Sequence, residues 1–155
     1  MTTSAPDPQP LAIAFALIAE TAPPPDTDRD DLECLTSFVL DAEETTGDWE
    51  VTVALVDDVR LQALHRDFMG IDTPTDIMTF PAGEPGEAPR GGELIISVDH
   101  ATSQAGAWGL SPHDEIRFLV IHGLLHLLGW RDDDEDARQR MLDRQQQLLD
   151  GWRAG

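Results

Sequence analysis

Residues 120–134 read VIHGLLHLLGWRDDD and place two histidines, His122 and His126, in an almost continuous apolar run. Leucine fills a protein core without bringing polar atoms into it, so the two imidazoles need a reason to be there. In a helix, positions four apart lie on the same side one turn apart, so both rings can reach one point. Neutral imidazole is the commonest metal ligand, and this spacing supplies half of a tetrahedral zinc site.

The residues that flank this run predict where its helix begins and ends. Ser111, Pro112 and Asp114 form a helix start, with Ser as the N-cap and Pro in the first turn. Gly129 predicts the end, because glycine readily adopts the left-handed conformation that closes a helix. Apolar residues occupy nearly every face between these points, so we expect a buried helix rather than an amphipathic surface helix.

A third ligand is expected just after this helix. Gly129 lets the chain turn back, and Asp132 follows ten residues after His122. A carboxylate is a competent zinc ligand, and three protein ligands leave the fourth position open, as in catalytic zinc sites. Asp133 and Asp134 are rival candidates for the same position. Two core histidines bonded to backbone carbonyls give the same H-x-x-x-H pattern and remain the alternative.

The rest of the chain predicts an α+β fold. Apolar or alternating segments indicate strands, and helical spacing or capping indicates helices. Strands are expected at 11–20, 49–58, 77–80 and 93–98, and helices at about 28–45, 57–68, 99–108, 112–128 and 134–152. We therefore expect a small mixed sheet of about four strands packed with about five helices, with the two histidines on a central buried helix. Residues 1–10 are expected to be disordered, and residues 11–155 to form a single domain.

Charge is the most unusual property of the composition. Thirty acidic residues face ten basic ones, all of them arginine, and the formal net charge is −20. Such a charge repels nucleic acid and anionic membranes at ordinary salt, so it argues against bulk electrostatic binding of RNA, though only weakly in concentrated salt, and DNA is not an expected partner. We interpret the acidity as adaptation to a salty cytosol, where the Debye length falls to roughly 3 Å at 1 M salt.

The remaining features predict a cytoplasmic protein. No apolar run reaches membrane-spanning length, and the N-terminus lacks the segments of a secretory signal, so no membrane partner is expected. Cys34 is alone, which fits a reducing compartment, and its position in an apolar helical stripe predicts a buried, inert thiol. Three histidines, His65, His100 and His113, have no ligand spacing and are expected at the surface.

Two families of metal-dependent enzymes share the outline of the histidine stretch. Metzincin-type proteases use H-E-x-x-H-x-x-G-x-x-H with Glu as general base, but Gly123 follows His122 here, so peptide hydrolysis by that route is not expected. Residues 122–132, H-G-L-L-H-L-L-G-W-R-D, resemble instead the signature H-G-x-L-H-L-x-G-Y-D-H of the YbeY family of single-domain bacterial endoribonucleases. GIDTPTDIMTFP (70–81) and GGELIISV (91–98) are similar to the family segments G-K-D-x-P-T-D-V-L-S-F-P and G-D-I-x-I-S.

The resemblance, which covers roughly residues 48–150, implies a zinc-dependent, single-strand-specific endoribonuclease. Its implied roles are rRNA maturation, including 16S rRNA 3′-end processing, and ribosome quality control, with ribosomal RNA and ribosomal proteins as partners. It also implies one Zn²⁺ per chain, held by His122, His126 and Asp132. Asp76 and Arg131 are candidate catalytic residues. The alternative for Asp76 is a hydrogen-bond acceptor for a ligand imidazole, or a plain turn-forming residue. The alternative for Arg131 is an ion-pair partner for the acidic residues that follow it.

Two positions depart from the family pattern. Asp132 stands where the family has its third metal-binding His, and the added negative charge makes a bound zinc a weaker Lewis acid. Met69 stands where the family usually has an Arg before the glycine equivalent to Gly70, and Met cannot contact a phosphate through charge. The missing Arg and the acidic surface favour an alternative function, a non-catalytic zinc-containing ribosome maturation factor. A generic metallohydrolase or peptidase is the third hypothesis.

Overall fold

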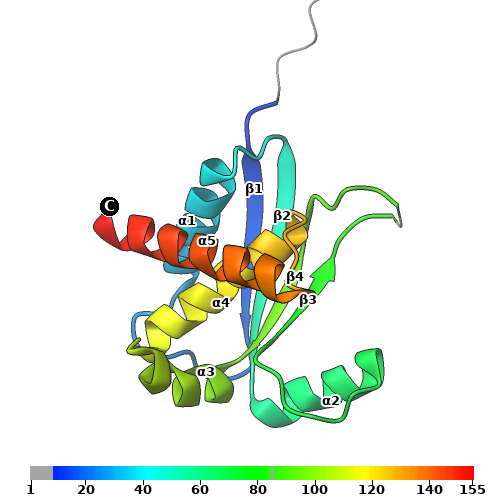
Figure 1. The fold of residues 1–155 in the computed structure, drawn as a ribbon, viewed down its shortest axis with the longest axis vertical. Coiled ribbons are helices and arrows are strands. Elements are labelled where there is room, and N and C mark those ends of the chain that lie inside the picture. The colour runs from blue at the N-terminus through cyan, green and yellow to red at the C-terminus, as the bar shows by residue number, and fades with distance from the viewer. Residues whose placement is uncertain (1–8, 85) are drawn as a thin grey trace, which may run out of the picture.

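The computed structural model of the chain describes residues 9–84 and 86–155. Its elements are shown in Figure 1: β1 (Ala12–Ala19), α1 (Arg29–Ala42), β2 (Asp48–Val56), α2 (Asp58–Met69), β3 (Ile77–Pro81), β4 (Gly91–Ser97), α3 (Val98–Ala105), the 3-10 helix η1 (Gly106–Trp108), α4 (Pro112–Leu127) and α5 (Glu135–Ala154). The predicted α+β fold, with a four-stranded mixed sheet and five α-helices, is confirmed. The disorder predicted for 1–10 falls mostly on residues 1–8, which lie outside the described residues.

The strands form one sheet in the order β1-β2-β4-β3. β1 pairs with β2 in parallel, and β2 pairs with β4 in parallel. β3 is an edge strand that runs antiparallel to β4. Parallel neighbours need a crossover connection, and α1 provides it between β1 and β2, while α2 and β3 lie between β2 and β4.

One face of the sheet packs against α1 and α4, and α5 packs against α4 (Figure 1). On β2, every second side chain from Trp49 to Leu55 is buried in this core, as strand alternation requires. The other face is partly covered by α2, where Leu61 clusters with Val56 and Met78. α4 is therefore held between the sheet and α5, which gives its two histidines a rigid support.

The ends of α4 are those that the sequence predicts. The Ser111 hydroxyl accepts a hydrogen bond from the Asp114 backbone N–H at 3.1 Å, and Pro112 occupies the first turn. After the helix, Gly129 has φ of +96°, a conformation that residues with a side chain rarely adopt. The Trp130 N–H then bonds to the Leu125 carbonyl at 2.9 Å. The chain thus reverses and carries residue 132 back to the histidines.

Two side-chain predictions are wrong. Cys34 is exposed, because Leu32 and Leu35 form the buried face of α1 and position 34 falls on its outer side. His113 is not a surface histidine, since its side chain is only 15% exposed and its Nδ1 lies 2.8 Å from the Thr27 hydroxyl. The prediction for His113 failed because the sequence does not show that the segment before α1 covers this side of α4. The prediction for Cys34 failed because position 34 lies outside the buried stripe of its helix.

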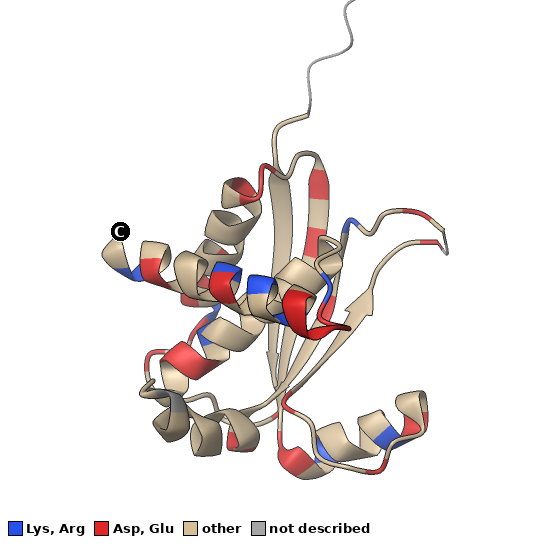
Figure 2. Ribbon diagram, viewed as in Figure 1, with Lys and Arg blue, Asp and Glu red and all other residues tan. Residues whose placement is uncertain are grey.

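Acidic residues occur on every α-helix (Figure 2). Eight of the ten arginines lie within 4.0 Å of a carboxylate oxygen: Arg29, Arg60, Arg66, Arg117, Arg131, Arg140, Arg144 and Arg153. Most of the positive charge is therefore already paired within the fold. Within residues 9–84 and 86–155, no helix combines the length and the apolar character that crossing a bilayer needs.

Candidate metal centre

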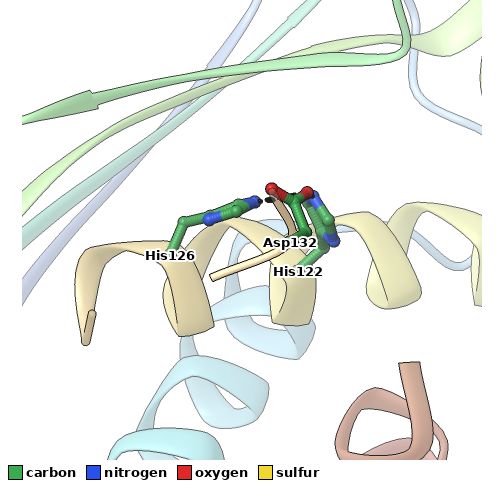
Figure 3. Close-up of side chains that lie close together, drawn as sticks. All are labelled: His122, His126 and Asp132. Atoms are coloured by element: carbon green, nitrogen blue, oxygen red, sulfur yellow. Dashed lines mark hydrogen bonds and ion pairs between the residues drawn. The ribbon is translucent and has the colours of Figure 1, made fainter. Parts of the chain in front are cut away.

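Three side chains converge near the C-terminal end of α4: His122 and His126 from the helix, and Asp132 from the loop that follows it (Figure 3). The His126 Nε2 atom lies 3.1 Å from the His122 Nε2 atom and 3.1 Å from Asp132 Oδ2. The third separation, from His122 Nε2 to Asp132 Oδ2, is 3.8 Å. The structure therefore brings the three predicted ligands together in a group that could hold a metal ion.

Both imidazole rings are oriented by hydrogen bonds at Nδ1. The His126 Nδ1 atom lies 3.1 Å from the Trp130 carbonyl oxygen, which can only accept, so Nδ1 carries the proton. The His122 Nδ1 atom lies 3.0 Å from Gln145 Oε1 on α5. The Gln145 amide nitrogen donates to the Phe118 carbonyl at 3.4 Å, which assigns Oε1 as the atom that faces His122. Each neutral ring therefore presents an unprotonated Nε2 atom to the group.

This arrangement places three acceptor atoms together with no proton between them. When both Nδ1 atoms carry the ring protons, the two Nε2 atoms and the Asp132 carboxylate repel one another unless a cation lies among them. In a tetrahedral zinc site with bonds of about 2.0–2.2 Å, neighbouring ligand atoms lie about 3.3–3.6 Å apart. The observed separations of 3.1, 3.1 and 3.8 Å bracket that range, so the donor set fits a zinc ion.

Burial favours the metal-binding form of His122. Desolvation lowers the pKa of this imidazole below its ordinary value, because the cationic form loses its hydration. The hydrogen bond to Gln145 acts in the opposite direction but is the smaller effect. Only the neutral ring has a lone pair for a metal, so the environment of His122 prepares it as a ligand.

The three ligands open onto a groove of about 460 Å³ lined by residues of α2 and β3. Its walls include His65 and Met69 of α2, and Asp76 just before β3. The ligand side chains remain 24–42% exposed, so the group is accessible from the groove. Three protein ligands with an accessible remaining position are typical of catalytic rather than structural zinc sites.

The other candidate residues are placed differently. Asp76 lines the groove, but the two imidazoles bond to Gln145 and Trp130 rather than to Asp76. The Arg131 side chain is 73% exposed and pairs with Asp133, and it lines a separate surface hollow. The ion pair that is the alternative for Arg131 is thus present, and Asp76 lies in the lining of the groove; a catalytic role of either residue stays a prediction.

Asp133 and Asp134, the alternative candidates for the third ligand, make other contacts. Asp133 pairs with Arg131. Asp134 is the N-cap of α5, where its Oδ1 atom accepts a hydrogen bond from the Ala137 N–H at 2.7 Å. Of the three consecutive acids, only Asp132 belongs to the group with the histidines.

Two residues of this region had no signal in the sequence. Gln145 lies 23 positions after His122, and only the packing of α5 on α4 reveals that it fixes a ligand ring. His65, predicted to be a plain surface histidine, lines the groove, and its Nδ1 atom lies 2.9 Å from the Thr73 carbonyl. That carbonyl holds the ring proton on Nδ1 and leaves the His65 Nε2 atom as an acceptor.

Gly123 shows why a protease-like glutamate is absent. The helix lies so close to the sheet that a Cβ atom at position 123 would meet Leu94 Cδ2 at 2.5 Å and Ile77 Cδ1 at 3.2 Å. A larger side chain would need α4 to move away from the sheet, which a close-packed core resists. A glutamate at position 123 would therefore need Leu94 and Ile77 to repack.

Known proteins are similar to this chain in sequence and in architecture. The sequence pattern described as Endoribonuclease YbeY matches residues 20–153. A protein of Bacillus pumilus named Endoribonuclease YbeY is 33% identical over 153 residues, which cover 92% of this chain and 96% of that protein. One of the same name from Moorella thermoacetica is 40% identical over 120 residues, 71% of this chain and 77% of that protein.

A solved structure agrees with the sequence comparisons. The solution structure of TM1509 from Thermotoga maritima superimposes with a TM-score of 0.62 at 26% identity, and the match covers 91% of this chain and 93% of that one. The resemblance that residues 122–132 carry is thus confirmed over most of the chain. The protein belongs to the YbeY family of endoribonucleases.

Proposed function

We propose that this protein is a zinc-dependent, single-strand-specific endoribonuclease that acts in rRNA maturation and ribosome quality control. Its substrate in maturation would be the 3′ end of 16S rRNA, and its partners ribosomal RNA and ribosomal proteins in the cytoplasm. One zinc ion per chain would be held by His122, His126 and Asp132. Family membership supports RNA cleavage, and the geometry of the three ligands supports the metal.

The observation that carries the proposal is the convergence of ligand atoms of His122, His126 and Asp132 at an accessible groove. A zinc ion bound there would supply a Lewis acid for a phosphate oxygen and would lower the pKa of water. The chain's own residues keep the ligands ready, because Gln145 and the Trp130 carbonyl hold the ring protons on Nδ1. His65 adds a ring to the same groove, and its Nδ1 contact with the Thr73 carbonyl leaves Nε2 as the atom that can accept a hydrogen bond or a proton from the neutral ring.

A non-catalytic zinc-containing maturation factor is the second candidate, and Met69 favours it. Met69 is 61% exposed and lines the groove without offering a charge to a phosphate. Arg66, one turn earlier on α2, pairs with Asp67 at 3.2 Å. A peptidase has less support, because position 123 carries a glycine packed against Leu94 and Ile77 in place of the protease glutamate.

The test is cleavage of a single-stranded RNA with the sequence of the 16S rRNA 3′ end, in molar KCl. Zinc-loaded wild type should cut the RNA, a chelator should stop cleavage, and added zinc should restore it. His126→Ala should be inactive, whereas His100→Ala, which removes a histidine of α3 outside the group, should cut as wild type does. The same RNA annealed to its complement should resist cleavage.

Each alternative has its own result in this experiment. Zinc-loaded wild type that binds ribosomal RNA but cuts none would support the non-catalytic maturation factor. Cleavage that persists at the wild-type rate in His126→Ala, purified in parallel, would show that the activity belongs to a contaminant. Cleavage of peptides in place of RNA would revive the general hydrolase.

A further inference from the structure

A second cavity, of about 400 Å³, adjoins the candidate metal centre. It shares His122 and Asp76 with the groove, so the two spaces meet at these side chains. The cavity combines apolar walls with glutamine amides and three carboxylates, those of Glu115, Asp76 and Asp143, and apolar walls with a few polar groups are typical of sites for small organic groups. Its apolar and amide lining comes from Leu110, Phe118, Leu119, Leu142, Gln104 and Gln146.

Glu115 of α4 lines this cavity and is only 3% exposed. Its Oε2 atom is buried and has no hydrogen-bond partner among the described residues. Burial, together with the nearby Asp76 charge, raises the pKa of Glu115 to about 7. An unpartnered buried carboxyl group destabilises a fold, so its presence beside the metal centre calls for a ligand that satisfies it.

The surroundings of Glu115 define that ligand. Asp76 disfavours an anion, and the apolar walls disfavour a strongly hydrated ion. A neutral ligand that is largely apolar on its faces and carries N–H donors at one edge fits these surroundings. A nucleobase has these properties, and enzymes that bind single bases hold them between aromatic or apolar side chains while polar groups read their edge. Phe118 supplies an aromatic surface in this cavity.

We propose that this cavity binds a guanine base of the RNA substrate, with the Glu115 carboxylate accepting hydrogen bonds from guanine N1–H and N2–H. The inference rests on the proposed RNA-cleaving function, because the base would belong to a nucleotide next to the phosphate in the groove. A carboxylate has two acceptor oxygens and no donor. Guanine alone among the four RNA bases presents two adjacent donors, whereas adenine, cytosine and uracil place an acceptor beside each donor on that edge.

Binding of the four nucleoside 5′-monophosphates tests the cavity without relying on cleavage. GMP, AMP, CMP and UMP would be titrated into zinc-loaded protein at pH 8 in molar KCl, with NMR shifts of the cavity side chains as the readout. Because all four carry the same phosphate, differences among them report the base. Wild type should bind GMP at least about tenfold more tightly than the other three, as expected for a paired set of charge-assisted hydrogen bonds.

Three variants make this test specific. Glu115→Gln should reduce the GMP preference to within about threefold, because an amide presents one acceptor and one donor. Leu142→Trp, which narrows the cavity at a residue that is 37% exposed, should weaken GMP binding while leaving Glu115 in place. Glu84→Gln makes the same chemical change in an exposed loop and should keep the preference. Equal binding of the four nucleotides, binding of none, or a GMP preference that survives in both cavity variants would overturn the inference.

Cleavage of oligonucleotides that differ in one nucleotide beside the cut separates this inference from the proposed function. If the cavity inference is correct, wild type should cut substrates with guanine at this position at least about tenfold faster than substrates with adenine, cytosine or uracil there. Glu115→Gln should lose that selectivity while still cutting the substrates without guanine. Cleavage without base preference contradicts the guanine site and leaves the endoribonuclease function standing. GMP selectivity without any cleavage supports the site and contradicts the endoribonuclease function.

Discussion

Gln145 and His122 are 23 residues apart in the sequence and are joined by a hydrogen bond of 3.0 Å between Oε1 and Nδ1. Gln145 is 2% exposed, and its amide nitrogen is held by the Phe118 carbonyl, so the amide has one orientation. The ring of His122 is consequently fixed by the packing of α5 on α4. The geometry of the candidate metal centre therefore depends on the packing of α5 against α4 as well as on the local sequence motif.

Replacing Gln145 should weaken metal binding without removing a ligand. Gln145→Ala leaves His122 Nδ1 without an acceptor, and we expect a loss of about 10–100-fold in zinc affinity, as for other residues that orient ligating histidines. Gln145→Glu keeps an acceptor for His122 Nδ1 but loses the amide donor to the Phe118 carbonyl, so it should restore part of the affinity. Competition with a chromophoric chelator measures both. Equal weakening in the two variants would mean that Gln145 acts only through packing.

Asp132 should be replaceable by histidine but not by alanine. Asp132→His supplies another zinc ligand and should keep one metal ion per chain, whereas Asp132→Ala should lower the affinity by more than about 100-fold. Asp133→Ala is the matched control, because Asp133 pairs with Arg131 and lies outside the group. Metal content after dialysis gives the answer. If Asp133→Ala loses the metal and Asp132→Ala keeps it, the third ligand is assigned to the wrong acid.

The convergence of His122, His126 and Asp132 could be predicted from sequence because the three lie within eleven consecutive residues. Helical spacing places His122 beside His126, and a glycine turn brings Asp132 back, so local geometry alone sets the group. The orienting contacts could not be predicted, since Gln145 comes from another helix. Helix capping likewise predicted both ends of α4, because the signals are adjacent to the ends.

The burial of single side chains was harder to predict, for the same physical reason. Cys34 occupies a helix with a clear apolar stripe, yet its own position faces solvent. His113 is covered because the residues before α1 approach it through Thr27. Glu115 looks like an ordinary acid in the first turn of a helix, where carboxylates are favoured, but it is enclosed in the cavity beside the metal centre.

Glu115 should make the protein less stable as the pH rises. Its pKa is about 7 in the fold against an ordinary value of 4.5, so the folded protein binds more protons than the unfolded chain between these values. The contribution of the Glu115 carboxyl group to the free energy of unfolding is fully present below pH 4.5 and is lost as the pH rises through 7. Glu115→Gln should therefore raise the free energy of unfolding at pH 8 by roughly 3 kcal/mol, and with it the melting temperature by about 6–12 °C, and should change both little at pH 4.5.

Thermal unfolding of wild type, Glu115→Gln and Glu84→Gln at several pH values checks this prediction. Glu84 is exposed, so its variant should follow wild type throughout. A Glu115→Gln variant that is less stable than wild type at pH 8 would mean that the carboxylate has a stabilising partner in the fold.

Salt should stabilise the fold. The net charge is −20, and most arginines are already paired, so repulsion among the remaining carboxylates opposes the compact state. Raising KCl from 0.1 M to 1 M shortens the Debye length from about 10 Å to about 3 Å and screens that repulsion. The midpoint of urea unfolding should rise over this range. A midpoint that is unchanged or falls would contradict adaptation to a salty cytosol.

Zinc content tests the central claim, that His122, His126 and Asp132 form a metal site, most directly. Wild type and variants would be stripped with chelator, supplied with zinc, dialysed and analysed for metal and protein. Wild type and His100→Ala should each hold one zinc per chain, and His126→Ala should hold none. Wild type that holds no zinc after loading, or His126→Ala that holds as much as wild type, would contradict the site.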